Sequence, residues 1–546
     1  MRSVLFGLFT FFGCAPLFAQ MNHRVSVGSN DEQAQGNSIQ VAMTPDARFV
    51  AFASEAANLV PGDTNQWSDI FLHDRQSRTT VRASIDSSGG EANYESLEPA
   101  VSADGRYVAF SSHSSNLVPN DTNARQDVFV HDLWTGETRR VSVASDGTQA
   151  DGSSYGPVIA GNGPVIAFVS TAKNLGADVY SSVFTHDLAS GETRLESRAE
   201  DGSPVNAYFP ALTFDARYLT FSTSARSLGS DSNEYFDVYR VDRTDGSLLL
   251  VSVGDEGRSG NNGSWASSIS QDGGVIAYSS GAANLVERDE NGYDLDIFVR
   301  DIDAGTTELV SRRTDGSNLG SRSSDIPVLS LDGRHVAFVA CELYQWNGHC
   351  YVHDRRLGMT SQVDLGHEGG PADSDCLEGP NVAISADGQL VAFVSLASNI
   401  VPDDTNSSLD VFLRERCFRS GAWTVYGEGF PGTLGVPELT PDQEPAVGEH
   451  LSLHASNSRG VYTLGFLLIG AAWDQPTDRG GRLYVAPSQL VPLVLPPAGG
   501  VVGGRIPLNE SLCGQSAFLQ LIEEDPGAEF GLSFSQGLEI VIGYGQ

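Results

Sequence analysis

Three stretches of the sequence carry carboxylates and amides at a spacing that suits a cation. Each contains Asp-Thr-Asn and a second aspartate six residues after the first. The residues are Asp63, Asn65 and Asp69, then Asp121, Asn123 and Asp127, and finally Asp404, Asn406 and Asp410. Oxygen ligands at alternate positions are typical of calcium loops, but none of these stretches has the glycine that an EF-hand loop needs at position 6. We therefore favour turns in which Asp and Asn side chains bind backbone N–H groups, and we keep calcium as an alternative.

A second set of polar residues could perform acid–base catalysis. These are the His-Asp pairs His73-Asp74, His131-Asp132, His186-Asp187 and His353-Asp354. They recur at the same place in a repeat, which is typical of residues that fix a turn. The sequence contains no P-loop and no HExxH zinc motif. We therefore predict no catalytic residue and no cofactor other than the calcium already considered.

The polar residues belong to a repeat that predicts the fold. Its anchor is a polar turn followed by an apolar run, as in SADGRYVAF at Ser102. Seven turn residues mark seven copies, spaced 53 to 60 residues apart: Asp46, Asp104, Asn162, Asp215, Asp272, Asp332 and Asp387. Each copy holds four strand-like runs, A to D, which in copy two are EPAVS, RYVAFSS, DVFVHD and TRRVSV. Four antiparallel strands repeated in this way predict an all-β fold, a seven-bladed β-propeller.

The two ends of the repeat region complement each other. The segment RVSVGSNDEQAQGNS at Arg24 matches RVSVASDGTQADGSS at Arg140, which is a run D with the loop after it. Copy seven has runs A, B and C, but no run D follows Arg416. We expect Arg24–Val27 to supply the missing strand and to close the ring, which removes two exposed sheet edges.

The repeat residues SxDGRxVAF and DVFVHD resemble the PD40 (WD40-like) repeats of TolB-like propellers over roughly residues 24–416. The resemblance implies the propeller fold. TolB itself belongs to the periplasmic Tol–Pal system and carries an additional N-terminal α/β domain, so we expect a protein other than TolB. The propellers of prolyl-oligopeptidase-like enzymes are also similar, but they are attached to a hydrolase domain.

The sequence divides into three predicted parts. Residues 1–19 read as a signal peptide with cleavage after Ala19, and Cys14 leaves a lipoprotein site as an alternative. Residues 20–418 form the propeller. Residues 419–546 lack the repeat and contain Gly-interrupted apolar runs such as YTLGFLLIGAA, which predict a β-sandwich-like C-terminal domain. Export permits disulfides, and the short excursion between Cys341 and Cys350 predicts a bond between these two cysteines.

The charge balance limits the partners. With 33 basic and 69 acidic residues, the net charge is −36, so the clustered Lys and Arg that bind nucleic acid are absent. No segment is long and apolar enough to span a membrane.

From these features we expect an exported protein that is periplasmic, at the cell surface or extracellular. We predict non-catalytic binding or scaffolding through the B–C and D–A loops, which share one face, with a protein or glycan as the ligand. A hydrolase or lyase acting on a polysaccharide or peptide at the channel mouth is the first alternative. A calcium-stabilised adhesion protein is the second.

Overall fold

The computed structural model describes residues 22–228, 233–289, 292–319, 326–341, 348–368, 370–376, 381–416, 421–479, 481–507, 512–513 and 515–544. The predicted signal peptide and Cys14 lie outside the described residues. The chain divides into two compact units, one of residues 20–416 and one that contains residues 417–546. Each unit is described by itself.

The described part of the first unit contains seven four-stranded antiparallel sheets, which we number in the order of the seven sequence copies. Sheet 1 consists of β2 (Ser38–Met43), β3 (Phe49–Ser54), β4 (Asp69–Asp74) and β5 (Thr79–Arg82). Sheet 2 consists of β6 (Ser96–Val101), β7 (Tyr107–Ser112), β8 (Asp127–Asp132) and β9 (Glu137–Arg140). Sheet 3 consists of β10 (Ser154–Ile159), β11 (Val165–Ser170), β12 (Ser182–Asp187) and β13 (Thr193–Leu195).

The remaining sheets follow the same order. Sheet 4 consists of β14 (Tyr208–Leu212), β15 (Tyr218–Thr223), β16 (Asp237–Asp242) and β17 (Leu248–Leu250). Sheet 5 consists of β18 (Ser264–Ile269), β19 (Val275–Ser280), β20 (Asp296–Asp301) and β21 (Thr306–Leu309). Sheet 6 consists of β22 (Val328–Leu329), β23 (His335–Cys341), β24 (Gly348–Asp354) and β25 (Met359–Gln362). Sheet 7 consists of β26 (Val382–Ile384), β27 (Leu390–Ser395), β28 (Asp410–Glu415) and β1 (Asn22–Arg24).

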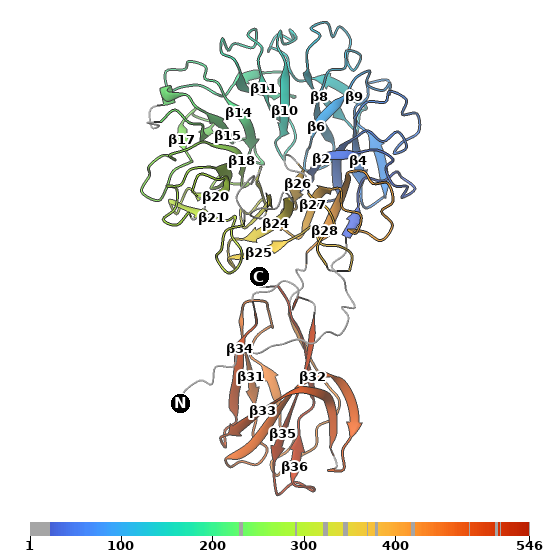
Figure 1. Cartoon of the computed structure of the whole chain (residues 1–546), viewed down its shortest axis with the longest axis vertical. Helices are drawn as coiled ribbons and strands as arrows, with labels where there is room; N and C mark the ends of the chain where they lie inside the picture. The colour runs from blue at the N-terminus through green and yellow to red at the C-terminus, as the bar shows by residue number, and fades with distance from the viewer. Residues whose placement is uncertain are drawn as a thin grey trace. The chain divides into compact units, whose positions relative to one another are not determined.

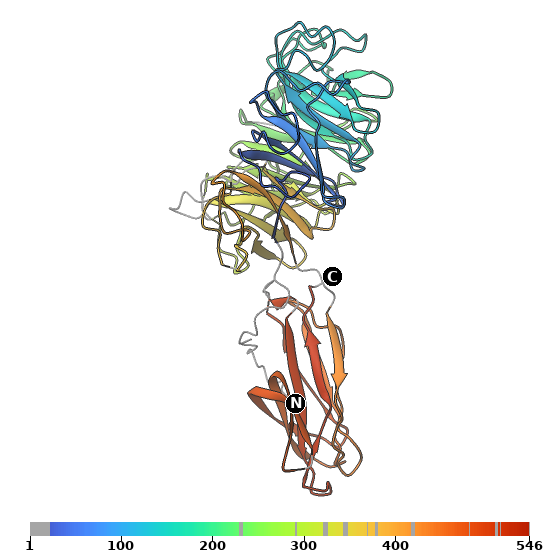
Figure 2. The same ribbon diagram turned by 90° about the vertical axis from the view of Figure 1, so that its right-hand side faces the viewer.

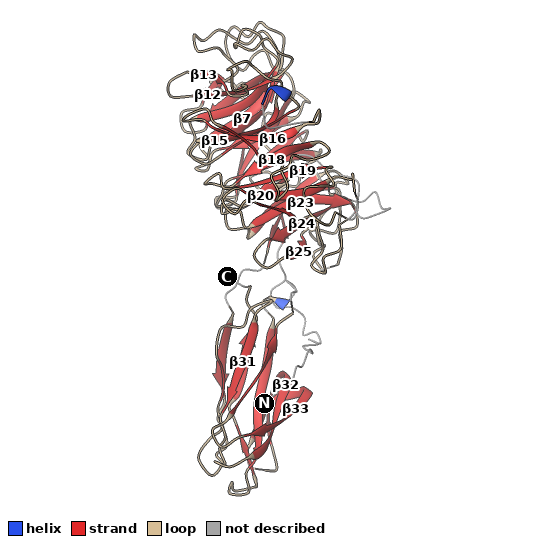
Figure 3. Cartoon of the chain, turned by 90° about the vertical axis from the view of Figure 1, so that its left-hand side faces the viewer, coloured by secondary structure: helices blue, strands red, loops and turns tan. Residues whose placement is uncertain are grey.

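The sheets follow one another around a centre, as the blades of a β-propeller do (Figure 1). Strands β2, β6, β10, β14, β18 and β26 lie toward the centre, and β9, β17, β21 and β25 lie toward the rim. The same ring seen from its side in Figure 2 shows sheets packed face to face. Apart from the short 3-10 helix Arg226–Leu228, the described residues of this unit are strands and loops (Figure 3).

The core lies between neighbouring sheets. The second and third strands of each sheet are almost wholly buried because both of their faces are covered, so they read as continuous apolar runs. Phe52 and Phe71 face each other across β3 and β4, with ring centroids 5.9 Å apart, and Phe110 and Phe129 repeat the pair in sheet 2. Ile70 of sheet 1 packs in one cluster with Phe110, which joins the two sheets.

The predicted pairing between the two ends of the repeat region is present. Strand β1 pairs antiparallel with β28, with Arg24 opposite Phe412, and the Val25 N–H donates to the Val411 carbonyl at 2.8 Å. The strand was expected at residues 24–27 and instead spans Asn22–Arg24, because the chain turns into the next loop directly after Val25. No helix in the described residues is long and apolar enough to cross a membrane.

The second unit consists of two further sheets. The larger contains β29 (Ala422–Tyr426), β37 (Gly537–Val541), β35 (Ser516–Glu524), β32 (Thr463–Pro476) and β33 (Arg482–Leu495), and β36 (Leu532–Phe534) pairs with β35. The smaller contains β30 (Leu439–Pro441), β31 (His450–Ala455) and β34 (Gly500–Arg505). Cys513, between β34 and β35, is disulfide-bonded, which the sequence did not predict.

Candidate functional site

The aspartates of the first calcium candidate face an arginine. Arg82, the last residue of β5, lies between the B–C loop of sheet 1 and the D–A loop that follows β5. Its Nη1 is 3.3 Å from Asp63 Oδ1, 3.1 Å from Asp69 Oδ2 and 3.1 Å from Glu91 Oε2. Both Arg82 and the two aspartates are nearly buried. A guanidinium therefore supplies the positive charge that these carboxylates require.

The same arrangement recurs where the sequence has the other two candidates. Arg140 Nη1 is 3.1 Å from Asp121 Oδ1 and 3.3 Å from Asp127 Oδ2. In sheet 7, Arg24 from the N-terminal strand lies 3.3 Å from Asp404 and 3.5 Å from Asp410. The three copies with the Asp-Thr-Asn sequence are thus the three whose fourth strand carries arginine at this position.

The asparagine of each loop forms the turn that we favoured from the sequence. Asn65 Oδ1 accepts the Trp67 N–H at 2.8 Å, and its Nδ2 donates to Asp69 Oδ2 at 2.9 Å. Asn123 and Asn406 make the same backbone bond two residues ahead, each at 2.9 Å. These are Asx turns, as expected for the asparagines, whereas the aspartates face arginines instead.

Burial disfavours the charged form of these carboxylates. Burial, and then the nearby charge of Asp69, raises the pKa of Asp63 to about 6, although Arg82 acts to lower it. Burial also raises the pKa of Asp69. Among the described residues, no group of three or more His, Cys, Asp or Glu side chains is arranged to hold a metal ion. A calcium ion at Asp63, Asn65 and Asp69 would have to displace the guanidinium.

The His-Asp pairs hold turns and neighbouring sheets, as the sequence indicated. Asp132 Oδ1 accepts the Trp134 N–H at 3.0 Å inside the C–D turn, and its carboxylate binds the guanidinium of Arg106 from the A–B turn. His131 Nδ1 lies 2.8 Å from Thr138 Oγ1, which in turn donates to the Ile85 carbonyl in the loop that precedes sheet 2. Burial lowers the pKa of His131, so it is neutral at physiological pH. The pair therefore links sheets rather than forming a catalytic dyad.

The predicted disulfide is absent from this structure. Cys350 is a free, buried thiol. Strand register places Cys341 opposite Gly348 and Cys350 opposite Val339, so the two cysteines are diagonal neighbours. Diagonal neighbours lie roughly 7 Å apart, whereas a disulfide needs Cβ atoms about 4 Å apart. Cys376 is a second free, buried thiol in the same core cluster.

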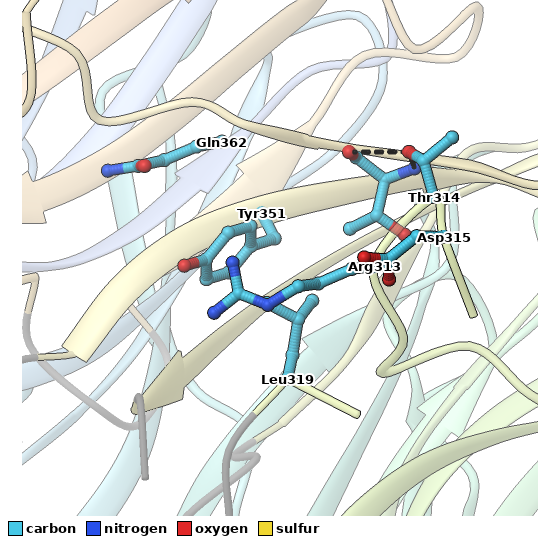
Figure 4. A pocket seen from close by; sticks show the side chains of 7 residues that line it. Arg313, Thr314, Asp315, Leu319, Tyr351 and Gln362 are labelled. Carbon is cyan, nitrogen blue, oxygen red and sulfur yellow. Dashed lines mark hydrogen bonds between the residues drawn. The ribbon is translucent and has the colours of Figure 1, made fainter. Parts of the chain in front are cut away.

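A pocket of about 390 Å³ lies between the loop that precedes sheet 6 and the outer strands of that sheet. In Figure 4, Arg313, Asp315 and Leu319 come from the loop, while Tyr351 and Gln362 come from β24 and β25. Thr314 and Thr360 are joined by a hydrogen bond at one side of it. The pocket holds no paired carboxylates and no nucleophile next to a base, so its residues do not indicate a reaction.

The B–C and D–A loops are held together at one face, which we call the loop face. Asn58 of a B–C loop donates through Nδ2 to the Gln33 carbonyl at 2.8 Å and accepts the Gln35 N–H at 2.9 Å, both in the preceding D–A loop. Four other sheets repeat this bidentate contact, through Asn116, Asn174, Asn284 and Asn399. The signal for it was in the sequence, as the asparagine that opens NLVP in copies one and two, NLGA in copy three, NLVE in copy five and NIVP in copy seven.

Exposed aromatic side chains gather on the loop face. Those in the loops are Trp67, Tyr94, Tyr180, Tyr235 and Tyr293, and Phe209 lies on the inner strand β14. Trp67 stacks on Tyr94 with ring centroids 4.3 Å apart, and His113 contacts the edge of Tyr94 at 5.7 Å. The opposite face carries the A–B and C–D turns, and we call it the tight-turn face. It has Trp134, which is 70% exposed and is covered on one side by Arg106.

The inner strands form a ring of contacts that the sequence did not reveal. Strand A has a bulged residue with a positive φ near its start, at Gln40, Glu98, Gly156, Phe209 and Ala266. Asn381 Oδ1 accepts the Gln40 N–H at 2.7 Å, Gln40 Oε1 accepts the Glu98 N–H at 2.8 Å, and Glu98 Oε2 accepts the Gly156 N–H at 2.8 Å. Each bulge is thus bound by a side chain from the preceding sheet, as far as Gly156.

No protein-family profile and no curated protein matches the chain. Solved structures are similar at low identity. A TolB-type protein from Agrobacterium tumefaciens is 13% identical over 64% of this chain and 97% of that chain, with a TM-score of 0.36. The propeller domain of the Trilobed protease from Pyrococcus furiosus is 12% identical over 69% and 93%, with a TM-score of 0.43. A prolyl endopeptidase is 12% identical over 86% and 61%, with a TM-score of 0.42.

A TolB-type protein and other propellers are thus among the structures to which this chain is similar. The all-β fold rests on the sheet order itself. At identities of 10–13%, these structures assign no function to the chain.

Proposed function

We propose that the chain is an exported, non-catalytic binding or scaffolding protein that holds a protein or glycan on its loop face. In this proposal the seven sheets are the blades of one closed propeller, and the second unit is a β-sandwich. The N-terminal sequence and the disulfide of Cys513 support export.

The distribution of exposed aromatic side chains carries the proposal. Tyr and Trp dominate binding energies because they bury a large area at a small cost in conformational entropy. In the described residues of the propeller, five of them project from loops of one face and are spread over several sheets. The Asp-Thr-Asn carboxylates are already bound by Arg82, Arg140 and Arg24, whereas these aromatic side chains are exposed.

The test compares the two faces of the propeller. The double variant Trp67→Ala/Tyr94→Ala is expected to lose retention in affinity gels that contain cellulose, xylan, chitin or laminarin. For a protein partner, a photo-cross-linking residue placed at position 67 is expected to capture it. The matched control is Trp134→Ala, which removes an exposed aromatic residue from the tight-turn face. Cross-links that arise from position 134 and not from position 67 would contradict the proposal.

One observation favours a hydrolase or lyase at the channel mouth as a second candidate. Glu98 is the single carboxylate among the described strand-A bulge residues, so one sheet departs from the others at the channel. Glycoside hydrolysis usually needs two carboxylates at a defined separation. Turnover of a polysaccharide that Glu98→Gln abolishes would replace the binding proposal with this one.

A further inference from the structure

The ring of side-chain contacts around the channel stops between sheets 3 and 4. Asn381, Gln40 and Glu98 each place an oxygen on the bulge N–H of the next sheet. Gly156 holds the same position in sheet 3 and has no side chain. The bulge N–H of sheet 4, on Phe209, therefore receives no side-chain oxygen from the preceding sheet.

The gap left by Gly156 has room for a ligand group. A Cβ added to Gly156 would meet no heavy atom within 4 Å. On one side, Glu98 accepts both the Gly156 N–H and the Ser111 hydroxyl through Oε2, which leaves Oε1 for a further donor. On the other side lies Phe209, whose side chain is 46% exposed.

Aromatic residues lie beside this gap. Tyr208 contacts Phe209 at 6.4 Å and the edge of Phe236 at 5.9 Å, measured between ring centroids. Tyr155 and Tyr208 pack against the same core cluster. The gap is therefore bordered by flat apolar rings and phenol hydroxyls.

The hydrogen-bonding groups at the gap select the class of ligand. The Phe209 N–H needs an acceptor, and Glu98 Oε1 needs a donor. An ammonium or guanidinium group supplies donors alone, and a carboxylate supplies acceptors alone. Sugar hydroxyls and peptide amides supply both. The exposed ring of Phe209 favours the sugar, because the C–H face of a sugar ring packs against an aromatic ring. We propose that the gap between Gly156 and Phe209 binds one ring of a neutral sugar chain.

This inference rests on the proposed function and names its ligand class, but it is tested at different residues. The loop-face proposal is judged at Trp67 and Tyr94, and the sugar site is judged at Gly156 and Phe209. Either result can therefore be negative while the other is positive.

The decisive variant is Gly156→Gln, which gives sheet 3 the residue that sheet 1 has. Gly156 has φ +60°, close to the +54° of Gln40 and the +57° of Glu98, so the backbone already accepts a side chain in this conformation. The new amide is expected to bind the Phe209 N–H and fill the gap. The full-length chain is titrated by calorimetry with neutral hexaoses of β-1,4-glucose, β-1,3-glucose, α-1,4-glucose, β-1,4-xylose and β-1,4-N-acetylglucosamine.

We expect at least one hexaose to bind the natural chain and Gly156→Gln to weaken it by about tenfold or more. Phe209→Leu is expected to weaken binding similarly, because it keeps an apolar side chain but removes the flat ring. The matched control is Gly147→Gln, which also replaces an unobstructed glycine of positive φ, in a D–A loop, and should bind like the natural chain. Thermal unfolding of each variant shows whether it is folded.

Three outcomes would overturn the proposal. The first is that no hexaose binds the folded natural chain. The second is that folded Gly156→Gln and Phe209→Leu bind as tightly as the natural chain. The third is that tetramethylammonium competes with the hexaose at this site, which would make it a site for cations.

Discussion

Arg82 Nη1 lies 3.1 Å from the Oδ2 of Asp69, a carboxylate that stands thirteen residues earlier in the sequence. The contact joins the start of β4 to the end of β5. The guanidinium lies against the carboxylates that were the candidate ligands of a calcium ion. Because Asp63 and Glu91 also face this guanidinium, three carboxylates share one arginine.

Replacing this arginine should destabilise the propeller in a pH-dependent way. Arg82→Gln leaves buried carboxylates without a cation, and such losses cost on the order of 3 kcal/mol. The pKa of Asp63 is already raised to about 6 in the folded state. A raised folded pKa means that the folded state binds a proton more tightly, so stability falls as pH rises from about 4 to 6. Without Arg82 this pKa rises further.

The loss caused by Arg82→Gln should therefore be largest at neutral pH and should shrink below about pH 6, where Asp63 is protonated. Thermal midpoints measured across this range check it. Arg78→Gln is the control, because Arg78 is mostly exposed and lies near Asp31 at 3.8 Å. A loss that is the same at every pH would show that Arg82 acts by packing alone.

The sequence predicted the repeat, the four strands and the Asx turns because these depend on local patterns. Alternation, turn residues and the Asn-x-x spacing each act within a few residues. It did not lead us to Arg82, although the signal was present. In the three Asp-Thr-Asn copies, run D has an arginine at the same position. Copy four has Leu250 at that position, and its B–C loop has Asp-Ser-Asn in place of Asp-Thr-Asn. Aligning the seven copies and comparing these two positions would have shown that the Asp-Thr-Asn loop and the arginine of run D occur together.

Calcium should leave the thermal stability of the chain unchanged. The carboxylates at Asp63 and Asp69, Asp121 and Asp127, and Asp404 and Asp410 already face an arginine. A ligand at free concentration c that binds the folded state alone stabilises it by RT ln(1 + c/Kd) and therefore raises the midpoint. Unfolding curves in millimolar calcium and in excess chelator should therefore coincide. A midpoint that rises with calcium and falls with chelator would favour the adhesion hypothesis.

Acid should weaken the contact between the A–B and C–D turns. Arg48 donates to both oxygens of Asp74, and this bond, aided by the backbone N–H groups of Gln76 and Ser77, lowers the pKa of Asp74 to about 2. A lowered folded pKa stabilises the folded state above the unfolded value of about 4, and the gain is lost as pH falls toward 2.

Asp74→Asn should therefore lower the thermal midpoint at neutral pH and have little effect near pH 2. Arg48 is partly exposed, so the loss should be on the order of 1 kcal/mol or less. Asp187→Asn is the control, because copy three has Pro164 in place of the arginine. Equal losses for the two variants would show that the carboxylate acts through its turn and not through Arg48.

The inner ring could not be read from the sequence for a different physical reason. Gln40 and Glu98 adopt a positive φ within runs of strand-forming residues, and such a bulge leaves no local pattern when the residue is not glycine. Their partners are side chains of the neighbouring copy, so the contact depends on how two sheets pack. Gly156 takes the same bulged position in sheet 3 but has no side chain to reach the next sheet.

The pairing of β1 with β28, which closes the ring, predicts that residues near the N-terminus stabilise sheet 7. Arg24 stands at the far end of the chain from Asp404 and Asp410, yet it has the role that Arg82 has within sheet 1. Ser26 Oγ donates to Asp410 Oδ1 at 2.5 Å, just as Ser84 does to Asp69. If β1 is the fourth strand of sheet 7, Arg24→Gln should lower the midpoint about as much as Arg82→Gln, because both remove the cation from a buried carboxylate pair. Removal of residues 20–26 should cost more, since it also exposes the edge of β28. Thermal unfolding and limited proteolysis of the four chains, the natural one included, measure both effects. An Arg24→Gln chain as stable as the natural one would mean that the two ends do not hold the ring together in solution.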